Sequence, residues 1–352
     1  MDKNSKPKVL MLGPDRAVHG GISALVNSYF EAGIDTMADI TYIGTMKEGS
    51  RLKKLLVAFC AYLKFLKMLP GCDIVHVNFS SDNSFMRKSL FIRSAKRHGK
   101  KLVLHQHGGD FKNYYANEIG EKRRRYIRET LEMADLMLVL TKSWKDYFGE
   151  LVPGVRIEVL PNGVITDGAP APDAGKDLKK MLFLGRICRD KGINELLDAM
   201  EQIHSDDPEV CLYLGGIYED QELRSRVEAA SEYVKYLGWI GGEEKEKMLD
   251  QCGVLVLPSY YEGFPVSVVE GMLHGCVVIA SAVGGIPEII TSGEDGILIE
   301  PKSTSSIKEA LENVMDNREL ADKIAAAAVK KVNSSFSIEA ILRVLSGFYR
   351  EL

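Results

Sequence analysis

The stretch that decides the fold is Ser259-Tyr-Tyr-Glu262-Gly263-Phe264-Pro265-Val-Ser-Val-Val-Glu270-Gly271. An apolar run at residues 253–258 precedes it and predicts a buried parallel strand. A helical pattern at residues 266–274 follows it. Glu262 therefore falls in a strand-to-helix loop and Glu270 in the helix, at the edge where open α/β sheets bind ligands. Two carboxylates at this spacing could hold sugar hydroxyls at two depths of one cleft, or they are simply a solvated loop acid and a helix-face acid.

The same alternation of strands and helices extends in both directions from this stretch. Apolar runs at 180–185, 210–216, 234–240, 277–281 and 296–300 complete a second half, and runs at 8–13, 40–43, 73–78, 101–105, 136–140 and 157–164 make a first half. Helical patterns separate most of them, which predicts two doubly wound parallel sheets covered by helices. The chain is thus expected to be an α/β protein with two Rossmann-like domains.

A Pro/Gly/Ala-rich segment at residues 166–175 has the composition of an interdomain linker. We therefore expect one domain at residues 1–165 and another at 176–336. The family resemblance given below implies that the last helix, at about 337–352, crosses back to the first domain, and the break at Asn333-Ser-Ser-Phe336 is where we place that crossing.

Charge is distributed unevenly along the 352 residues. Residues 1–163 hold 26 Lys and Arg against 17 Asp and Glu, a net charge of +9, whereas residues 164–352 hold 19 against 32, a net charge of −13. The helical pattern at 51–69 carries only positive charges, and the patterns at 85–98 and from 121 are also basic. These helices predict either contact with an anionic membrane surface or ordinary crossover helices with solvated lysines. Nucleic acid is a third anion, but the chain shows no recognised nucleic-acid motif.

Six scattered cysteines, without a Cys-x-x-Cys pair and several of them in apolar strand-like runs, favour buried thiols in a reducing compartment. We recognise neither a signal peptide nor an apolar run of about 18 residues, which favours a cytoplasmic location, possibly at the inner face of the cell membrane.

The loop Gly185-Arg186-Ile-Cys-Arg-Asp-Lys191-Gly192 offers cations at the end of a strand. A departing diphosphate must be stabilised electrostatically, either by a metal held by carboxylates or by fixed cations and amides. We find no Asp-x-Asp motif, while Arg186 supplies a guanidinium fork and Lys191 a point charge. The plain alternative is a pair of surface bases that cap a helix.

With this loop, the Glu262-x7-Glu270 pattern resembles retaining glycosyltransferase family 4, which has the GT-B fold, and in particular its bacterial capsule or exopolysaccharide enzymes. The resemblance covers nearly the whole chain and is more specific in the second half. It implies two Rossmann-like domains that face each other across a cleft, the first binding the acceptor and the second the nucleotide-sugar donor.

The resemblance also assigns roles to residues. Arg186 and Lys191 would clamp the diphosphate, Glu270 would bind the ribose hydroxyls and Glu262 would lie near the transferred sugar. His107, in the loop His107-Gly-Gly-Asp110, would contact the donor sugar, with His105 the weaker candidate and Asp110 a candidate for orienting the acceptor hydroxyl. The remaining donor-binding candidates are Gly20, Gly21, Trp239, Gly263, Phe264 and Val266; Pro265 has no N–H to donate. Gly20 and Gly21 could instead form only a tight turn, and Trp239 could belong to the core.

The function implied is transfer of a sugar from a UDP- or GDP-sugar to a hydroxyl of a glycan or a lipid-linked acceptor, with retention and without a metal or other cofactor. Two alternatives stay open: a sugar-nucleotide epimerase on the same fold, and a non-catalytic nucleotide-sugar-binding protein. A nicotinamide-dependent oxidoreductase is disfavoured because the Gly-x-Gly-x-x-Gly fingerprint is absent.

Overall fold

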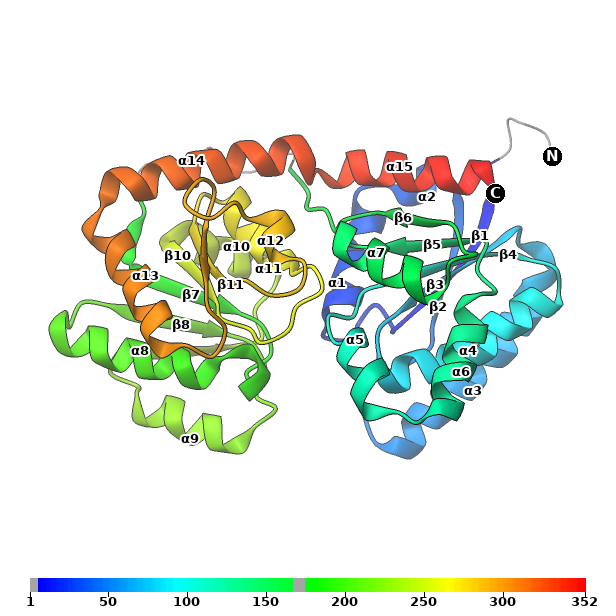
Figure 1. Ribbon diagram of the computed structural model, residues 1–352, viewed down its shortest axis with the longest axis horizontal. Coiled ribbons are helices and arrows are strands. Elements are labelled where there is room, and N and C mark those ends of the chain that lie inside the picture. Colours follow the sequence, from blue (N-terminus) through cyan, green and yellow to red (C-terminus); the bar gives the residue numbers. More distant parts are fainter. Residues whose placement is uncertain (1–5, 167–174) are drawn as a thin grey trace. The chain divides into compact units, whose positions relative to one another are not determined.

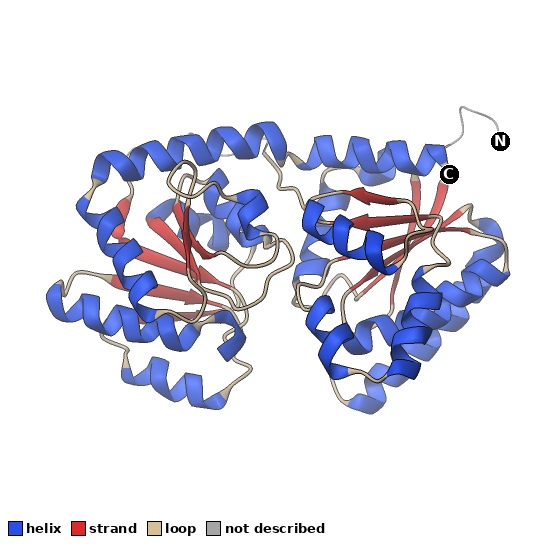
Figure 2. Cartoon of the chain, viewed as in Figure 1, coloured by secondary structure: helices blue, strands red, loops and turns tan. Residues whose placement is uncertain are grey.

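Parallel strands and the helices between them build two separate units in the computed structural model, which describes residues 6–166 and 175–352. Unit 1 comprises Met1–Ile165 together with Ile338–Leu352, and unit 2 comprises Thr166–Ser337. Most of the segment expected to link the domains lies outside the described residues. The fold expectation of two helix-covered parallel sheets is confirmed (Figure 2).

The sheet of unit 1 has the strand order β2-β1-β3-β4-β5-β6, and every described pair is parallel. The strands are β1 (Lys8–Gly13), β2 (Asp39–Gly44), β3 (Ile74–Phe79), β4 (Lys101–Gln106), β5 (Leu136–Val139) and β6 (Ile157–Val159). From β1 the chain moves outward to β2 and then returns to β3 on the other side. The strand order therefore reverses between β1 and β3, which is where open α/β sheets place ligands.

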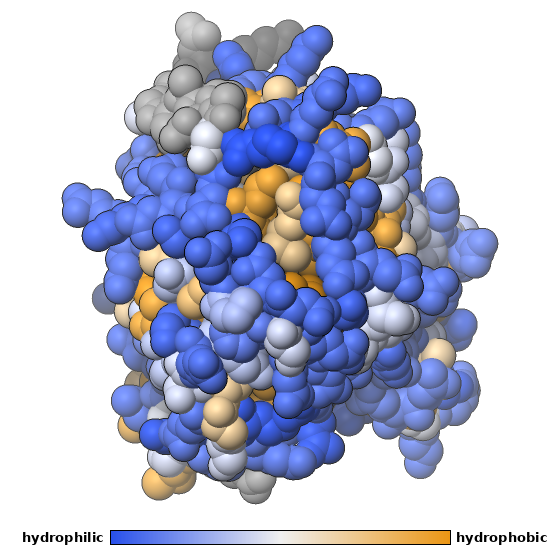
Figure 3. Space-filling view, turned by 90° about the vertical axis from the view of Figure 1, so that its left-hand side faces the viewer, coloured by the Kyte–Doolittle hydropathy of each residue, from blue (hydrophilic) through white to orange (hydrophobic). Residues whose placement is uncertain are grey.

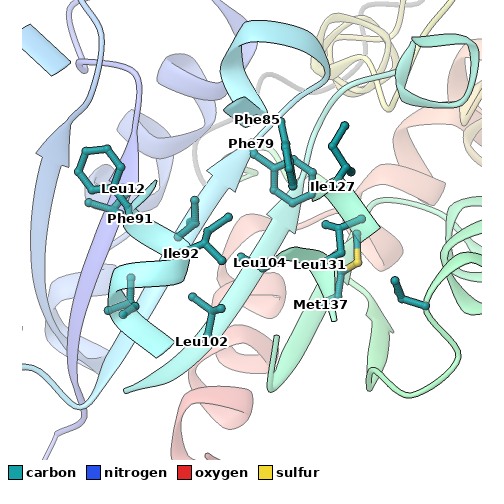
Figure 4. Close-up of a cluster of buried hydrophobic side chains, with 14 of the residues drawn as sticks. Leu12, Phe79, Phe85, Phe91, Ile92, Leu102, Leu104, Ile127, Leu131 and Met137 are labelled. Atoms are coloured by element: carbon teal, nitrogen blue, oxygen red, sulfur yellow. The ribbon is translucent and has the colours of Figure 1, made fainter. Parts of the chain in front are cut away.

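Helices cover both faces of this sheet and bury two separate cores (Figure 1). One core lies under α3 (Arg51–Met68), α4 (Asp82–Arg97), α6 (Glu121–Leu131) and α7 (Lys142–Leu151). Figure 4 shows part of it, where Phe79 and Phe85 lie beside Ile127. The other core lies under α1 (Gly21–Glu31), α2 (Ile34–Met37) and the last helix, α15 (Ile338–Glu351). Short turns follow β4, namely α5 (Phe111–Asn113) and a π-helical turn at Tyr114–Glu118.

The C-terminal helix α15 packs into unit 1, as expected for a chain that crosses back. Its first amide, from Ile338, donates to the carbonyl of Val164 (2.9 Å). Phe336 and Ser337 separate it from α14 (Arg318–Ser335), so the break overlaps the end of the predicted stretch at 333–336, whose first three residues still belong to α14.

The sheet of unit 2 has the order β12-β11-β10-β7-β8-β9, again parallel. The strands are β7 (Asp177–Leu184), β8 (Cys211–Gly215), β9 (Val234–Gly238), β10 (Cys252–Leu257), β11 (Val277–Ser281) and β12 (Ile297–Ile299). Its helices are α8 (Ile193–Asp206), α9 (Gln221–Ala229), α10 (Gly242–Gln251), α11 (Val266–Leu273), α12 (Ile286–Ile289), α13 (Thr304–Asp316) and α14. Here the strand order reverses between β7 and β10, so the loops after these two strands flank the expected ligand position.

The amino-terminal edge of the same sheet carries a small cavity of about 100 Å³, lined by Leu178, Val277 and Ala321 among others. Figure 3 views unit 2 from the side of α13 and α14 and shows an apolar hollow ringed by hydrophilic side chains. This edge is opposite to the carboxyl ends of the strands, so the hollow is separate from the loops after β7 and β10.

Candidate functional site in unit 2

The loop after β7 and the loop after β10 meet at one edge of the sheet of unit 2. The Tyr260 amide donates to the carbonyl of Asp190 (2.8 Å), and the Tyr260 hydroxyl donates to Glu195 of α8 (2.6 Å). Gly192 adopts a left-handed conformation (φ +68°), and a side chain there would overlap the carbonyl of Pro258. The two loops are therefore locked together through their backbones.

An ion pair between Lys191 and Glu262 lies at this junction. The Lys191 amine, in the 3₁₀ turn Arg189–Lys191, donates to the Glu262 carboxylate, which also accepts from the Ser259 hydroxyl (2.7 Å). The two side chains are only 15% and 10% exposed. A carboxylate this buried needs such partners, since an unpaired one would bear the full cost of desolvation.

Arg186 stands on the same edge but is far more accessible. Its guanidinium donates to Glu219, in the loop after β8, at 2.7 Å, while its side chain remains 58% exposed. Burial works against the charged form, but Glu219 outweighs it and keeps the pKa of Arg186 above its ordinary value. Arg189 points elsewhere, since it pairs with Asp220 (3.0 Å) and Glu222. Arg186 and Arg189 therefore both pair with carboxylates that follow β8, whereas Lys191 pairs with Glu262 after β10.

Glu270 is the fifth residue of α11 and is held by a cation from a neighbouring helix. The Lys245 amine, on α10, donates to its carboxylate at 2.6 Å, and the two side chains are 28% and 22% exposed. Glu262, before α11, and Glu270, within it, therefore both belong to the segment that follows β10.

The segment between the two glutamates offers backbone rather than side chains. Phe264 is only 6% exposed and its ring packs edge-on against Phe336 (5.5 Å between centroids). Gly263 is buried and Val266, the first residue of α11, is half-buried. Pro265 caps the helix, and the first amide of the helix to bond back is that of Val268, which donates to the Pro265 carbonyl (3.2 Å), so the amides of Val266 and Ser267 are placed to bind an anion. Trp239 is 45% exposed at the end of β9, so it is not a core residue.

Several residues that the sequence did not single out shape this site. Glu219, Lys245 and Ser259 are the partners of Arg186, Glu270 and Glu262. Gly284, in the loop after β11, has φ +54°, and a Cβ there would overlap the carbonyl oxygen of Glu262. Glu219 and Lys245 carry no motif, and only the strand order brings them to this edge, whereas Ser259 opens the stretch that contains Glu262.

Candidate functional site in unit 1

His107 lies where β4 ends and is fixed from two sides. Its amide donates to the carbonyl of Phe79 (2.8 Å), and its Nε2 is hydrogen-bonded to the side chain of Asn78 (2.9 Å). Asn78 in turn donates to the carbonyl of Leu12 in β1 (3.2 Å). The imidazole is thus oriented by a side chain that joins strands β1, β3 and β4.

His107 is the last member of a row of three rings, His76, His105 and His107, which we call the histidine row. The ring centroids are 5.4 Å and 4.0 Å apart, and His76 Nδ1 is hydrogen-bonded to the hydroxyl of Tyr349 in α15 (2.6 Å). Burial lowers the pKa of His76 and of His107 to about 3, with His76 and Lys88 adding to the effect at His107. Burial and the two neighbouring rings lower the pKa of His105 as well. His107 is therefore a neutral imidazole at physiological pH.

Lys88 of α4 is the second perturbed group of unit 1. It is 2% exposed, its amine donates to Ser84 (3.0 Å), and burial together with Arg87 lowers its pKa to about 7. Lys88 is one of the bases of the basic helical pattern at 85–98, but its side chain is buried and does not contribute to an exposed basic surface. The expectation of buried thiols is likewise correct for Cys72, Cys252 and Cys276 but not for the exposed Cys60.

Gly20 and Gly21 stand at the start of α1, after β1 and beside the reversal of strand order. A Cβ at either position would meet no atom within 4 Å, and neither has a left-handed φ. Packing and backbone conformation therefore do not require glycine at either position.

Comparison with known proteins

Two family profiles divide the chain between them. The one described as "Glycosyltransferase Family 4" matches residues 34–167, and the one described as "Glycosyl transferases group 1" matches residues 169–331. The chain spans about half the length of the first curated relatives that it matches, 54% in one case and 45% in another.

Individual similarities agree with these profiles. A GDP-mannose:cellobiosyl-diphosphopolyprenol alpha-mannosyltransferase from Xanthomonas campestris is 25% identical over 66% of this chain and 62% of its own. The fold resembles sucrose-phosphate synthase from Thermosynechococcus elongatus (TM-score 0.81, 22% identity, 98% of this chain and 99% of that one). It also resembles Anabaena HepE, solved with UDP-glucose (TM-score 0.76, 17% identity, 98% and 100%). The chain belongs to the glycosyltransferases of family 4 with the GT-B fold.

Proposed function

We propose that this protein is a retaining, metal-independent glycosyltransferase that moves a sugar from a UDP- or GDP-sugar to an acceptor hydroxyl. The observation that supports the proposal is the edge of unit 2 at the reversal of strand order, where Lys191 after β7 pairs with Glu262 after β10 and Arg186 lies in the same loop as Lys191. Solved neighbours of the same fold bind UDP and UDP-glucose, which supports a nucleotide sugar as donor.

Each residue then has one task. Glu270 accepts hydrogen bonds from the ribose hydroxyls, and Glu262 lies beside the transferred sugar. Arg186 and Lys191, with the amides at the start of α11, stabilise the negative charge that develops on the leaving diphosphate. Trp239 is exposed at the end of β9 and offers a surface for the base.

The reaction breaks the bond between the anomeric carbon and the diphosphate oxygen and forms a bond from that carbon to the acceptor oxygen. The acceptor proton passes to the departing phosphate on the same face, so no side chain serves as general base. His107, neutral and oriented by Asn78, is suited to hydrogen-bond the donor sugar rather than to repel or attract charge.

We further propose a glycan or lipid-linked acceptor at the inner face of the cell membrane, in polysaccharide biosynthesis. Unit 1 carries the net charge of +9 found for residues 1–163, since residues 338–352 add two positive and two negative charges. The Xanthomonas relative acts, by its name, on a diphosphopolyprenol. A lipid of this kind presents phosphate charge that a basic unit attracts.

The test measures release of nucleoside diphosphate from a panel of UDP- and GDP-sugars in the presence of candidate acceptors. Arg186→Ala and Lys191→Ala should each lower turnover about 100- to 1,000-fold, the usual effect of removing a charge-stabilising donor. Arg189→Ala is the matched control, because it lies in the same loop but pairs with Asp220 and Glu222, and it should keep near-normal turnover.

Near-normal turnover in both Arg186→Ala and Lys191→Ala would refute the proposal that these two cations stabilise the leaving diphosphate. Isomerised donor without free nucleoside diphosphate would instead identify an epimerase, and donor binding without turnover on any acceptor a binding protein. Retention is checked by the anomeric configuration of the first product in NMR, and metal independence by activity after chelation with EDTA.

A further inference from the structure

Helix α3 exposes a continuous row of large apolar side chains. Leu52, Leu55, Leu56, Phe59 and Leu63, which we call the apolar stripe, are between 51% and 78% exposed. At about 100° per residue these five positions fall within an arc of about 100° on one side of the helix. Exposed single leucines are ordinary, but a contiguous apolar row of this kind marks an interaction surface.

The apolar stripe is not needed by the core of unit 1. The opposite side of α3 buries Ala61, Phe65 and Leu69, and the Phe65 ring packs on Phe91 of α4 (5.1 Å between centroids). The helix therefore already has the inward face that a crossover helix requires. The stripe is a second apolar face, and the neighbouring helix α4 also exposes a large apolar side chain, Leu90 (60%).

The charges beside the apolar stripe have one sign. α3 contains five basic residues and no acidic one. The exposed side chains of Lys53, Lys64 and Lys67 fall along one flank of the stripe, between it and the buried face. An apolar face bordered by lysines matches a bilayer with anionic headgroups, where the amines reach the phosphates and the apolar side chains reach the acyl chains.

We propose that α3 docks this protein on an anionic lipid bilayer, lying in the plane of the interface with the apolar stripe inserted. The inference deepens the proposed function, on which it rests for its meaning, because it names the surface by which unit 1 reaches a membrane-borne acceptor. No helix in the described parts of the chain is long and apolar enough to cross a bilayer.

The position of α3 connects such docking with the ligand edge of unit 1. A cavity of about 400 Å³ lies between α3 and the end of β2, and Leu56 of the apolar stripe lines it together with Lys47 and Lys64. Asp15, in the loop that follows β1, forms another part of its wall. A lipid-linked acceptor held in the bilayer would thus arrive beside the loop that leads to Gly20 and Gly21.

A second copy of the chain is the competing occupant. In a twofold contact through α3, the lysines of one stripe would face the lysines of the other, without a carboxylate on either helix to offset them. Charge therefore favours an anionic partner over self-association.

The experiment is co-sedimentation of the full chain with vesicles of phosphatidylglycerol and phosphatidylcholine, compared with phosphatidylcholine alone, at low and high salt. Leu55→Gln with Phe59→Gln should lower the partition coefficient about tenfold or more, because the inserted apolar area is lost. The matched control replaces two exposed apolar residues outside α3, Tyr236→Gln with Val344→Gln, and should bind like the parent protein.

A charge variant separates the two contributions. Lys53→Gln, Lys64→Gln and Lys67→Gln together should weaken binding at low salt and remove much of its dependence on salt. Equal partition of the parent and the Leu55/Phe59 variant would overturn the proposal, as would vesicle binding that ignores the anionic lipid. A parent dimer in size-exclusion chromatography that the Leu55/Phe59 variant loses would assign the stripe to a second copy instead.

Donor binding keeps this outcome distinct from that of the proposed function. The thermal shift caused by UDP or GDP should be the same in the parent and in all α3 variants, since the residues assigned to the nucleotide itself, Arg186, Lys191, Trp239 and Glu270, lie in unit 2. Vesicle binding that depends on α3, without any thermal shift caused by nucleotide, would support the docking surface and refute the transferase proposal. A nucleotide-induced thermal shift without vesicle binding would support a nucleotide-binding enzyme and refute the docking surface.

Discussion

Gly284 gives the sharpest test of how the site of unit 2 is held. It has φ +54°, and an added Cβ would lie 2.8 Å from the carbonyl carbon of Glu262 and overlap its oxygen, whereas ordinary contacts are about 3.5–4.0 Å. A methyl group cannot rotate away from such an overlap. In the Gly284→Ala variant, the backbone at Glu262 or at residue 284 must therefore move apart to relieve the overlap.

The expected magnitude has two parts. Ala in a left-handed conformation costs about 1–2 kcal/mol, and overpacking against a rigid backbone about 1–3 kcal/mol more. Gly293 provides the matched control, because it has φ +80° in the same unit but no atom within 4 Å of an added Cβ. Gly293→Ala should show only the first part, so the difference between the two variants isolates the contact with Glu262.

The assays are denaturant unfolding and the thermal shift produced by UDP- and GDP-sugars. We expect Gly284→Ala to be the less stable variant and to bind donor more weakly than Gly293→Ala, because moving the Glu262 backbone disturbs its pair with Lys191. Equal stability and equal donor affinity in the two variants would show that the loop after β11 does not position Glu262.

Three further predictions concern buried charge. Lys191→Met should lower the free energy of unfolding by about 3–5 kcal/mol, because it leaves the buried carboxylate of Glu262 without its cation. Adding Glu262→Gln should restore stability but not turnover. A double variant as unstable as the single one would contradict this. Lys88→Met should raise the free energy of unfolding at pH 7 by at least about 1 kcal/mol. This gain should shrink as pH rises toward the unfolded pKa near 10.5, because the native amine is already neutral above about pH 7. The control Lys122→Met, at an exposed position, should show no such trend. Because of the histidine row, the free energy of unfolding should fall as pH drops from about 6.5 toward 3, by up to about 1.4 kcal/mol per pH unit for each ring. The reason is that the rings bind protons in the unfolded chain at pH values where the buried native rings stay neutral. A free energy of unfolding that does not change between pH 7 and pH 5 would contradict this prediction.

The strands and the helices between them could be predicted from the sequence because a strand buried on both faces needs an unbroken apolar run. The runs before Glu262 and at Val277–Ser281 are fully buried in the structure, and the loops after strands fall where the parallel arrangement requires. Glu262 and Glu270 could also be identified from the sequence, because the strand before them, the loop and the following helix are all read from neighbouring residues.

The partners of these residues could not be predicted, because they depend on strand order. Lys245 reaches Glu270 only because α10 and α11 lie on either side of β10 along the chain and pack in one unit. Glu219 reaches Arg186 only because β8 lies beside β7. The alternation of strands and helices along the chain looks the same whatever the order of the strands in the sheet. The alternation therefore cannot predict which side chains from different loops or helices will pair.

The helical pattern at 51–69 shows a different limit. Its periodicity is consistent with a crossover helix that has a lysine edge and equally with an interfacial helix, because both have one apolar face. The structure separates the two by showing that Phe65 faces the core while Phe59 faces solvent. An apolar surface on both sides of one helix is visible only when the direction of the core is known.

The two cations of the clamp differ in a way that bears on how a donor would be bound and released. Lys191 is 15% exposed and tied to Glu262, which is itself tied to Ser259, so its position is set before any ligand arrives. Arg186 is 58% exposed and held by one surface carboxylate, a contact weak enough to be exchanged for a phosphate. A fixed lysine can stabilise the developing charge without reorganisation, while a mobile arginine can follow the diphosphate as it enters and leaves. A rigidly placed cation and an exchangeable one are thus both present in the eight-residue loop between β7 and α8.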